Sequence, residues 1–249
     1  MRMKSISVVY PVYNEESYVK LTIEQTLAVI SKITDDFEII VVNDASSDKT
    51  LALLRDYSRD NKKIKIFCNK SNKKLGGTLK KGFKEATKEL VLYSDFDMPF
   101  NLEDIIKAVE ILEKKGADFL SAYRINREVD GIKRFVYSIV YNQLINFLFN
   151  INVIDVNFSF KLFKRSILEN IVLESEGSFI SAELLIRAKI KGFKIVQFPV
   201  FYYPRTKGRS RLGSIAVVAK IIKELFIFYF KYFLLYLREK NAPKYYSVL

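Results

Sequence analysis

The chain has 249 residues, a formal net charge of +13 and no histidine. The absence of histidine excludes imidazole general bases, histidine metal ligands and histidine pH switches. With one cysteine, Cys68, the sequence also excludes a disulfide framework and a cysteine-ligated zinc or iron–sulfur site. The chemistry of this protein must therefore use carboxylates, lysine or arginine, hydroxyls, or a metal ion that prefers oxygen ligands.

Positive charge is concentrated in the second half of the chain. Residues 1–125 contain 21 basic and 19 acidic side chains, whereas residues 126–249 contain 20 basic and 9 acidic side chains. We therefore expect the second half to face an anionic partner. Residues 1–4 lead directly into an apolar segment that is too short for a signal peptide, so we expect a cytoplasmic protein.

Five short apolar segments in the first half have the composition of buried parallel strands, because they are continuous runs rich in β-branched and aromatic residues. The predicted strands are Ile6–Tyr10, Phe37–Val42, Ile64–Phe67, Leu90–Tyr93 and Phe119–Ala122. Amphipathic segments alternate with them, and the predicted helices are residues 16–31, 48–60, 78–89 and 102–115. This alternation predicts an α/β fold with an open, mostly parallel, Rossmann-like sheet.

Polar residues follow three of the predicted strands, in the segments Pro11–Glu15, Asn43–Ser46 and Asp95–Asp97. Because ligands of open α/β sheets bind at the carboxyl ends of the strands, we expect these segments to meet in one crevice. The two carboxylates of the third segment suit Mg²⁺ or Mn²⁺, which take oxygen ligands and share them with substrate phosphates.

Two long segments of the second half have the pattern of amphipathic helices. Residues 135–154 carry no charge, and neutral polar side chains recur every four residues at Ser138, Asn142, Asn146 and Asn150. This polar stripe favours a helix that lies in a bilayer interface or packs on a partner. Residues 214–238 place basic side chains opposite a wide apolar face, which predicts a membrane-interface helix, a dimer seam or a surface packed on the core.

The motifs of the first half resemble those of family 2 glycosyltransferases, which have the GT-A fold. The resemblance rests on the order and spacing of Pro11–Glu15, Asn43–Thr50, Gly76–Gly82 and Asp95–Asp97. Three later segments are similar to the branch that contains dolichyl-phosphate mannose synthase and polyprenyl-phosphate glucosyltransferases. These segments are Ser121–Arg124, Asp155–Lys161 and Arg205–Leu212.

The resemblance implies a role for each matched residue. The residues expected to bind the nucleotide sugar are Pro11, Tyr13, Glu15, Asn43, Asp44, Gly76 and Asp95. Asp95 and Asp97 would hold the Mg²⁺ or Mn²⁺ ion, and the catalytic residues would be Asp97, Arg205 and Arg211. The residues expected to bind the acceptor phosphate are Arg124, Arg134 and Ser138.

The resemblance also implies how the chain is divided. We expect a GT-A catalytic domain over residues 1–213, with a nucleotide-sugar half at 1–125 and an acceptor half at 126–213. Residues 214–249 would form an amphipathic helix and tail. This last segment would place the enzyme peripherally on a membrane, or bind a second copy of the chain or a membrane protein.

The implied reaction is a metal-dependent, inverting transfer of a hexose from a nucleotide sugar of the GDP-mannose or UDP-glucose type to a polyprenyl phosphate. A phosphate monoester has a second pKa of about 6 and is largely ionised at neutral pH, so this acceptor needs no general base. The sequence fits such a reaction because it has no histidine.

Two alternatives stay open at the level of sequence. A glycosyltransferase acting on a hydroxyl of a glycan or glycolipid would need a carboxylate base, for which Glu183 is the candidate. A nonenzymatic basic module could instead bind a membrane or nucleic acid. We expect no nucleic-acid partner, because apolar helices interrupt the basic residues and exposed aromatic residues are not arranged for base stacking.

Overall fold

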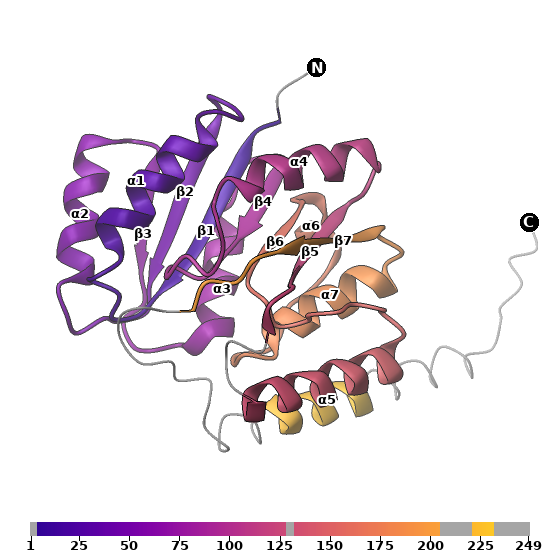
Figure 1. Ribbon diagram of the computed structural model, residues 1–249. Coiled ribbons are helices and arrows are strands. Elements are labelled where there is room, and N and C mark those ends of the chain that lie inside the picture. Colours follow the sequence, from indigo (N-terminus) through magenta and orange to yellow (C-terminus); the bar gives the residue numbers. More distant parts are fainter. Residues whose placement is uncertain (1–3, 128–131, 205–220, 232–249) are drawn as a thin grey trace, which may run out of the picture. The chain divides into compact units, whose positions relative to one another are not determined.

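The computed structural model of the chain describes residues 4–127, 132–204 and 221–231 (Figure 1). The chain divides into two compact units, Met1–Ser210 and Arg211–Leu249, which are described separately. The first unit has the predicted α/β architecture, in which helices cover a mostly parallel sheet of seven strands. The predicted functional division at residues 125 and 213 stays a prediction.

The sheet has the strand order β3-β2-β1-β4-β6-β5-β7. Its strands are β1 (Ile6–Val12), β2 (Phe37–Asn43), β3 (Ile64–Cys68), β4 (Leu90–Tyr93), β5 (Phe119–Arg124), β6 (Lys161–Lys164) and β7 (Ile195–Val200). β6 runs antiparallel to both of its neighbours, β4 and β5, whereas the other adjacent pairs are parallel. The start of β6 therefore lies at the same edge of the sheet as the carboxyl ends of β4 and β5.

Helices pack on both faces of this sheet. The helices of the first unit are α1 (Val19–Ile30), α2 (Thr50–Asp60), α3 (Lys74–Glu85), α4 (Asp104–Lys114), α5 (Ile132–Phe149), α6 (Ser166–Asn170) and α7 (Ile180–Ile190). Helix α1 lies between α2 and α4 (Figure 1) and shares a core with Val8 and Tyr10 of β1. Helix α3 packs on the opposite face, because a Cβ atom added to Gly82 would lie 2.5 Å from Val9.

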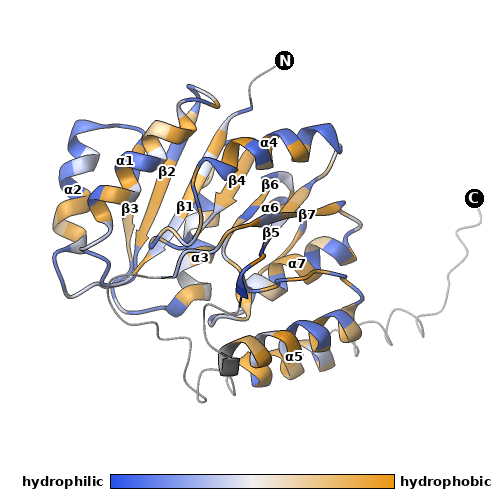
Figure 2. Cartoon of the chain, in the orientation of Figure 1, coloured by the Kyte–Doolittle hydropathy of each residue, from blue (hydrophilic) through white to orange (hydrophobic). Residues whose placement is uncertain are grey.

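The hydrophobic core follows from this layered arrangement. The strands are largely hydrophobic, whereas α2 and α4 alternate between hydrophobic and hydrophilic residues (Figure 2). All seven residues of β2 are buried, including the charged Glu38. Continuous apolar strands are therefore explained by burial on both faces, as the sequence predicted.

The five strands predicted in the first half are present in the predicted order, but the third helix is displaced. Helix α3 begins at Lys74 and ends at Glu85, whereas the sequence predicts residues 78–89. The end is early because the backbone N–H of Thr87 donates to Glu38 Oε1 at 2.8 Å and that of Lys88 donates to Ser7 Oγ at 3.1 Å. These tertiary contacts hold the residues after α3 in the non-helical segment that leads to β4.

The neutral polar stripe of α5 packs on the protein itself. Asn142 Oδ1 accepts a hydrogen bond from the backbone N–H of Val156 at 2.9 Å. Asn146 accepts from the N–H of Val153 and donates to its carbonyl, both at 2.9 Å. The helix ends before Asn150, which has a φ of 50°. The stripe therefore satisfies backbone groups of the following loop. The expectation that this helix lies in a bilayer interface or packs on a partner stays a prediction.

In the second unit, the structure describes a helix at residues 221–231, inside the predicted amphipathic segment. The rest of the predicted segment 214–249 lies outside the described residues. No helix within the described parts of the chain is both long enough and apolar enough to span a bilayer.

Candidate functional site at the carboxyl edge of the sheet

The loops that follow β1 and β2 are joined by hydrogen bonds. Asn14 has a φ of 56°, a left-handed conformation that asparagine tolerates, and its N–H donates to Ser46 Oγ at 2.9 Å. Its side-chain oxygen accepts from the N–H of Ser47 at 2.8 Å. The N–H of Glu15 donates to Thr50 Oγ1 at 2.8 Å. Two of the segments predicted to bind the nucleotide sugar therefore lie side by side.

Asp44 fixes the loop that follows β3. Its side chain is buried, and Oδ1 accepts hydrogen bonds from Asn69 Nδ2 at 2.8 Å and from the backbone N–H of Lys73 at 2.7 Å. The preceding residue, Asn43, is also buried, and its carbonyl accepts from the N–H of Asn69 at 2.9 Å. Asp44 thus joins the end of β2 to the residue immediately before α3.

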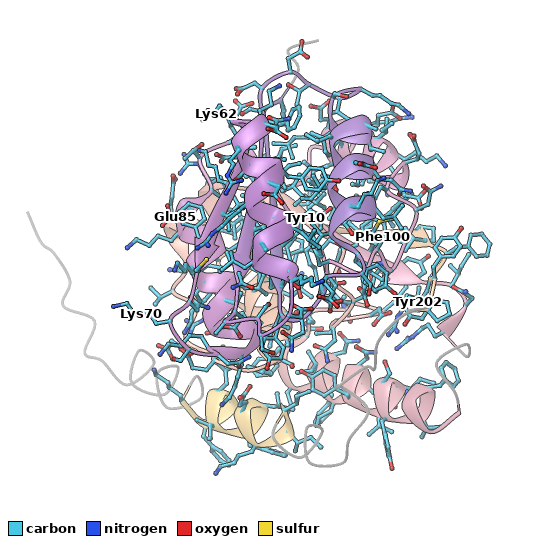
Figure 3. All side chains as sticks on the ribbon, turned by 90° about the vertical axis from the view of Figure 1, so that its left-hand side faces the viewer. Tyr10, Lys62, Lys70, Glu85, Phe100 and Tyr202 are labelled. Atoms are coloured by element: carbon cyan, nitrogen blue, oxygen red, sulfur yellow. The ribbon has the colours of Figure 1, made fainter. Side chains whose placement is uncertain are left out.

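The loop that contains Asp95 and Asp97 is anchored through the residue between them. The carbonyl of Phe96 accepts a hydrogen bond from Thr22 Oγ1 of α1 at 2.7 Å. The Phe96 ring lies edge-on to the ring of Tyr10, with centroids 5.3 Å apart, and Figure 3 shows Tyr10 in the interior of the molecule. Phe96 is buried, whereas the two aspartates on either side of it are partly exposed.

The buried hydroxyl of Tyr93, the last residue of β4, bonds to Asp95. Tyr93 also has a side-chain hydrogen bond with Ser181 at the start of α7. Burial raises the pKa of Tyr93 well above its usual value, and the charge of Asp95 raises this pKa further. The phenol therefore keeps its proton at neutral pH and donates a hydrogen bond to the Asp95 carboxylate.

Asp95 and Asp97 fit a hard divalent cation. Among the described residues, no group of three or more carboxylates and cysteines is close enough to hold a metal ion. Mg²⁺ is commonly bound by one or two carboxylates, with substrate phosphates and water completing its coordination. A pair of partly exposed carboxylates at a strand end matches this mode of binding.

A positively charged cluster surrounds the buried carboxylate of Asp155. Arg124 binds it through two nitrogens, with Nε 2.7 Å from Oδ2 and Nη2 3.2 Å from Oδ1. Arg127 Nε lies 3.8 Å from Oδ2, and its Nη2 donates to Ser138 Oγ at 2.5 Å. Lys161 Nζ lies 3.5 Å from the Asp155 carbonyl. Arg124 and Arg127 thus place two guanidinium groups at one carboxylate, and the amine of Lys161 lies beside the backbone carbonyl of the same residue.

Lys161 links this cluster to Asp95. It is fully buried, is paired with Tyr93 across β4 and β6, and donates to Ser121 Oγ at 2.9 Å. Burial lowers the pKa of Lys161 to about 7, although the charges of Asp155 and Asp95 oppose this shift. Lys161 is therefore close enough to both Asp155 and Asp95 for each charge to affect its pKa.

Aromatic rings border the same cluster. The Arg124 guanidinium lies over the rings of Phe158, at 5.5 Å, and Tyr202, at 5.1 Å. Phe158 also contacts Phe100 edge-on, with ring centroids 6.1 Å apart. Figure 3 shows Phe100 and Tyr202 toward one side of the molecule. These contacts fix the orientation of Arg124, whose paired nitrogens already bind Asp155.

The structure describes the side chains of some of the other predicted site residues but not of all of them. Pro11, Tyr13 and Glu15 are partly buried in and after β1, and Gly76 is buried in the first turn of α3. The residues whose side chains lie outside the described part are Arg134, Arg205 and Arg211. Their predicted roles in binding phosphates stay predictions.

Glu183, the candidate base for a hydroxyl acceptor, is fully buried in α7. Its Oε1 accepts from the N–H of Glu174 at 2.9 Å and from Arg187 Nε at 2.7 Å. Its Oε2 accepts from the N–H of Ser175 at 2.8 Å. Both carboxylate oxygens are thus used in intramolecular contacts.

Four polar residues at this edge were not singled out by the sequence. They are Tyr93, Arg127, Lys161 and Ser181. Lys161 had a local signal, because it is a charged residue between the apolar Phe160 and Leu162. Tyr93 had none, since an aromatic residue at the end of a buried strand is common.

The chain is similar in sequence to known glycosyltransferases. The model for glycosyl transferase family 2 matches residues 7–172. Glycosyltransferase AglD of Haloferax volcanii is 28% identical over 207 residues, which cover 80% of this chain and 33% of that protein. An undecaprenyl-phosphate 4-deoxy-4-formamido-L-arabinose transferase of Pectobacterium atrosepticum is 29% identical over 218 residues. These residues cover 87% of this chain and 65% of the transferase. The chain therefore spans less than two thirds of the length of these two relatives.

Solved structures have the same fold at low sequence identity. Glucosyl-3-phosphoglycerate synthase from Mycobacterium tuberculosis has a TM-score of 0.68 at 17% identity, covering 89% of this chain and 79% of its own. Mannosyltransferase PcManGT from Pyrobaculum calidifontis, solved with GDP-Man and Mn²⁺, has a TM-score of 0.59 at 19% identity. The match covers 82% of this chain and 58% of the mannosyltransferase chain. The fold is thus GT-A-like, and because the family model matches more than half of its length, the chain belongs to glycosyl transferase family 2.

Proposed function

We propose that this protein transfers a sugar from a nucleotide sugar to a polyprenyl phosphate at a membrane surface, with Mg²⁺ or Mn²⁺ bound at Asp95 and Asp97. Family membership, the joined loops after β1 and β2, and the anchored loop after β4 support a nucleotide-sugar donor. Relatives at 28% and 29% identity are named as undecaprenyl-phosphate transferases, which supports a lipid phosphate acceptor.

The observation that carries the acceptor class is the charge of the cluster at Asp155. The guanidinium groups of Arg124 and Arg127 lie at one carboxylate, so the cluster has an excess of positive charge. A divalent cation at Asp95 and Asp97 would balance those two carboxylates, so they would no longer compensate the cluster. The remaining positive charge matches a phosphate monoester dianion better than it matches a neutral sugar hydroxyl.

Apolar side chains beside this cluster suit the lipid part of such an acceptor. Ile125 and Ile154, the neighbours of Arg124 and Asp155 in sequence, are exposed. On α5, Phe147 is 86% exposed and Val140 is 58% exposed. We infer that these exposed apolar side chains contact a membrane surface, which would present the phosphate head group to the cluster while the prenyl chain stays in lipid.

In the proposed reaction, an oxygen of the acceptor phosphate attacks the anomeric carbon while the bond from that carbon to the donor diphosphate breaks. The nucleoside diphosphate leaves, and the configuration at the anomeric carbon inverts. The acceptor oxygen is already ionised, so the protein has no proton to remove. A metal ion held by Asp95 and Asp97 would supply charge compensation for the leaving diphosphate.

The protein's own residues position the two substrates. Asp44 and the loops joined to it would hold the nucleotide, and Arg127 with Ser138 would bind the acceptor phosphate. Arg124 would act through Asp155, because its guanidinium is already committed to that carboxylate. Arg205 and Arg211, predicted as catalytic residues, would act as clamps on the donor or acceptor phosphates. The hexose predicted from the sequence stays a prediction, since the Pectobacterium relative is named for an arabinose derivative.

Transfer assays with matched acceptors test this proposal. The donors would be UDP-glucose, GDP-mannose and UDP-linked 4-deoxy-4-formamido-L-arabinose, each with Mn²⁺ or Mg²⁺. The acceptors would be a short polyprenyl phosphate and the same polyprenol without its phosphate. We expect product only with the phosphate, and loss of product when the metal is chelated with EDTA.

The Arg127→Met variant separates acceptor binding from donor binding. Because this change removes one charged donor to the acceptor phosphate, we expect the acceptor KM to rise about tenfold, with the donor KM nearly unchanged. Arg165→Met, at a partly exposed arginine paired with Glu169, is the control. Transfer to polyprenol, or to a sugar hydroxyl, at the rate seen with the phosphate would contradict the proposed acceptor.

A further inference from the structure

Glu183 holds a short backbone segment that lies between α6 and α7. The two oxygens of its buried carboxylate accept the successive backbone N–H groups of Glu174 and Ser175, at 2.9 and 2.8 Å. Arg187, one turn later on α7, donates to the same carboxylate at 2.7 Å and lies 3.5 Å from the Glu174 side chain. This arrangement fixes the position of residues 174–176.

Residues 174–176 in turn fix the start of α3. The N–H of Gly76 donates to the carbonyl of Glu176 at 3.0 Å. A Cβ atom at Gly76 would lie 2.2 Å from the carbonyl oxygen of Ser175, so only glycine allows this close approach. Lys80 of α3 forms an ion pair with Glu176 and donates to the Glu174 carbonyl at 3.1 Å. The two segments are more than 90 residues apart in sequence but pack tightly together.

The start of α3 in turn holds Asp44. Lys73, the residue before α3, donates its backbone N–H to Asp44 Oδ1 at 2.7 Å. Asn69 donates to the same oxygen at 2.8 Å and to Thr78 of α3 at 3.3 Å. A continuous series of contacts therefore leads from Glu183 through residues 174–176 and Gly76 to Asp44, the residue predicted to bind the nucleotide.

We propose that Glu183 is a positioning residue for the donor nucleotide and not the general base that a hydroxyl acceptor would require. It acts by anchoring residues 174–176, which hold the start of α3 and so orient the backbone N–H that fixes Asp44. This inference rests on the proposed function, because it assumes that Asp44 contacts a nucleotide.

The environment of Glu183 agrees with positioning and disagrees with proton transfer. A general base must reach its proton directly or through one water, whereas this carboxylate is inaccessible to solvent and accepts three hydrogen bonds. Proton uptake would also weaken the ion pair with Arg187. Anchoring needs a buried carboxylate whose two oxygens both accept hydrogen bonds, as in this structure.

Two variants test the inference through different atoms. Glu183→Gln keeps the shape of the side chain but replaces one acceptor oxygen with an amide donor, so it cannot hold both backbone N–H groups. Gly76→Ala forces α3 away from the Ser175 carbonyl and leaves Glu183 intact. The second variant keeps the test decisive if the first does not fold.

The readouts are affinity for UDP and GDP in the presence of Mn²⁺, by titration calorimetry, and hydrogen exchange of residues 174–176. We expect both variants to bind the preferred nucleotide about tenfold more weakly, because each disturbs the support of Asp44, and to exchange these amides faster. In transfer assays the donor KM should rise by a similar factor, with kcat within about threefold of the unmodified protein.

Glu38→Gln is the matched control. Glu38 is another buried glutamate that accepts hydrogen bonds from a backbone N–H, hydroxyls and a cation, but it lies at the start of β2, at the opposite end of that strand from Asp44. We expect this variant to lose stability while its nucleotide affinity stays unchanged.

The outcomes separate the two proposals. If the unmodified protein binds neither UDP nor GDP, the proposed function fails, and this inference fails with it. If it binds one of them and both variants bind it equally well, only the positioning role is overturned. A collapse of kcat with unchanged nucleotide affinity, together with loss of the acidic limb of the pH profile, would identify Glu183 as a base and would also overturn this role.

Discussion

A single hydroxyl group orients the carboxylate of Asp95. Tyr93 donates its phenolic proton to Asp95 and shares a second hydrogen bond with Ser181. Burial and the charge of Asp95 keep the pKa of this phenol high, so the contact persists across the physiological pH range. Hydrogen bonds to metal-ligating carboxylates fix their orientation and affect metal affinity.

Tyr93→Phe tests this role at the scale of one atom. The change removes the donor to Asp95 and keeps the ring in the core, so we expect Mn²⁺ in the presence of nucleotide to bind about tenfold more weakly. Electron paramagnetic resonance of free Mn²⁺ measures this affinity without any transfer reaction. Tyr57→Phe, which removes a phenol that donates to Glu24 at 3.0 Å on the surface, is the control. Equal Mn²⁺ affinity in both variants would contradict the role.

Helix α5 illustrates how one element serves two surroundings. Its neutral polar side chains bond to the loop after the helix. They satisfy backbone groups of Val153 and Val156 that would form hydrogen bonds to a neighbouring strand if this loop were part of a sheet. The opposite face keeps exposed apolar residues such as Val140 and Phe147. The helix is therefore amphipathic in an unusual sense, with its polar stripe turned inward and apolar residues turned outward.

Asn146→Leu tests the structural role of this stripe. The variant loses the two hydrogen bonds to the backbone of Val153, so we expect the free energy of unfolding to fall by about 2 kcal/mol. Urea denaturation monitored by circular dichroism measures the change. Gln143→Leu, at an exposed position of the same helix, is the control and should change stability by less than about 0.5 kcal/mol. A similar loss in both variants would show that the stripe has no special role.

At the scale of the whole molecule, the end of the sheet opposite the functional site depends on Glu38. This buried carboxylate of β2 accepts from Ser7 of β1 at 2.6 Å, from Lys65 of β3 at 2.6 Å and from Thr87 before β4 at 2.8 and 2.9 Å. Burial alone would raise the pKa of Glu38, but the hydrogen bonds from these residues outweigh it and lower the pKa. One side chain thus connects four neighbouring parts of the sheet.

This network predicts how stability depends on pH. Because the pKa of Glu38 is lower in the folded than in the unfolded state, its contribution is fully present above the unfolded pKa of about 4.3 and is lost as the pH falls through the folded pKa. We expect Glu38→Gln to lower Tm at pH 7 and to reduce the drop in Tm between pH 5 and pH 3, measured by calorimetry. Glu169→Gln, at an exposed ion pair, should leave that drop unchanged. An undiminished drop in Glu38→Gln would contradict the assignment.

The sequence by itself determined the α/β class, the five strands of the first half and the segments at their carboxyl ends, because continuous apolar runs and polar strand ends are local patterns. It also indicated the family, through motifs whose order and spacing are visible along the chain. These features depend on neighbours in sequence or on rules shared by all open α/β sheets.

Only the tertiary structure decided what the individual polar groups do. β6 brings Lys161 beside Tyr93 and Asp95, although these residues are more than 60 positions apart in sequence. The same folding turns Glu183 into an anchor for residues 174–176 and turns the stripe of α5 inward. A sequence pattern shows that a polar side chain needs a partner, but the choice of partner depends on which distant backbone and side-chain groups are buried with it.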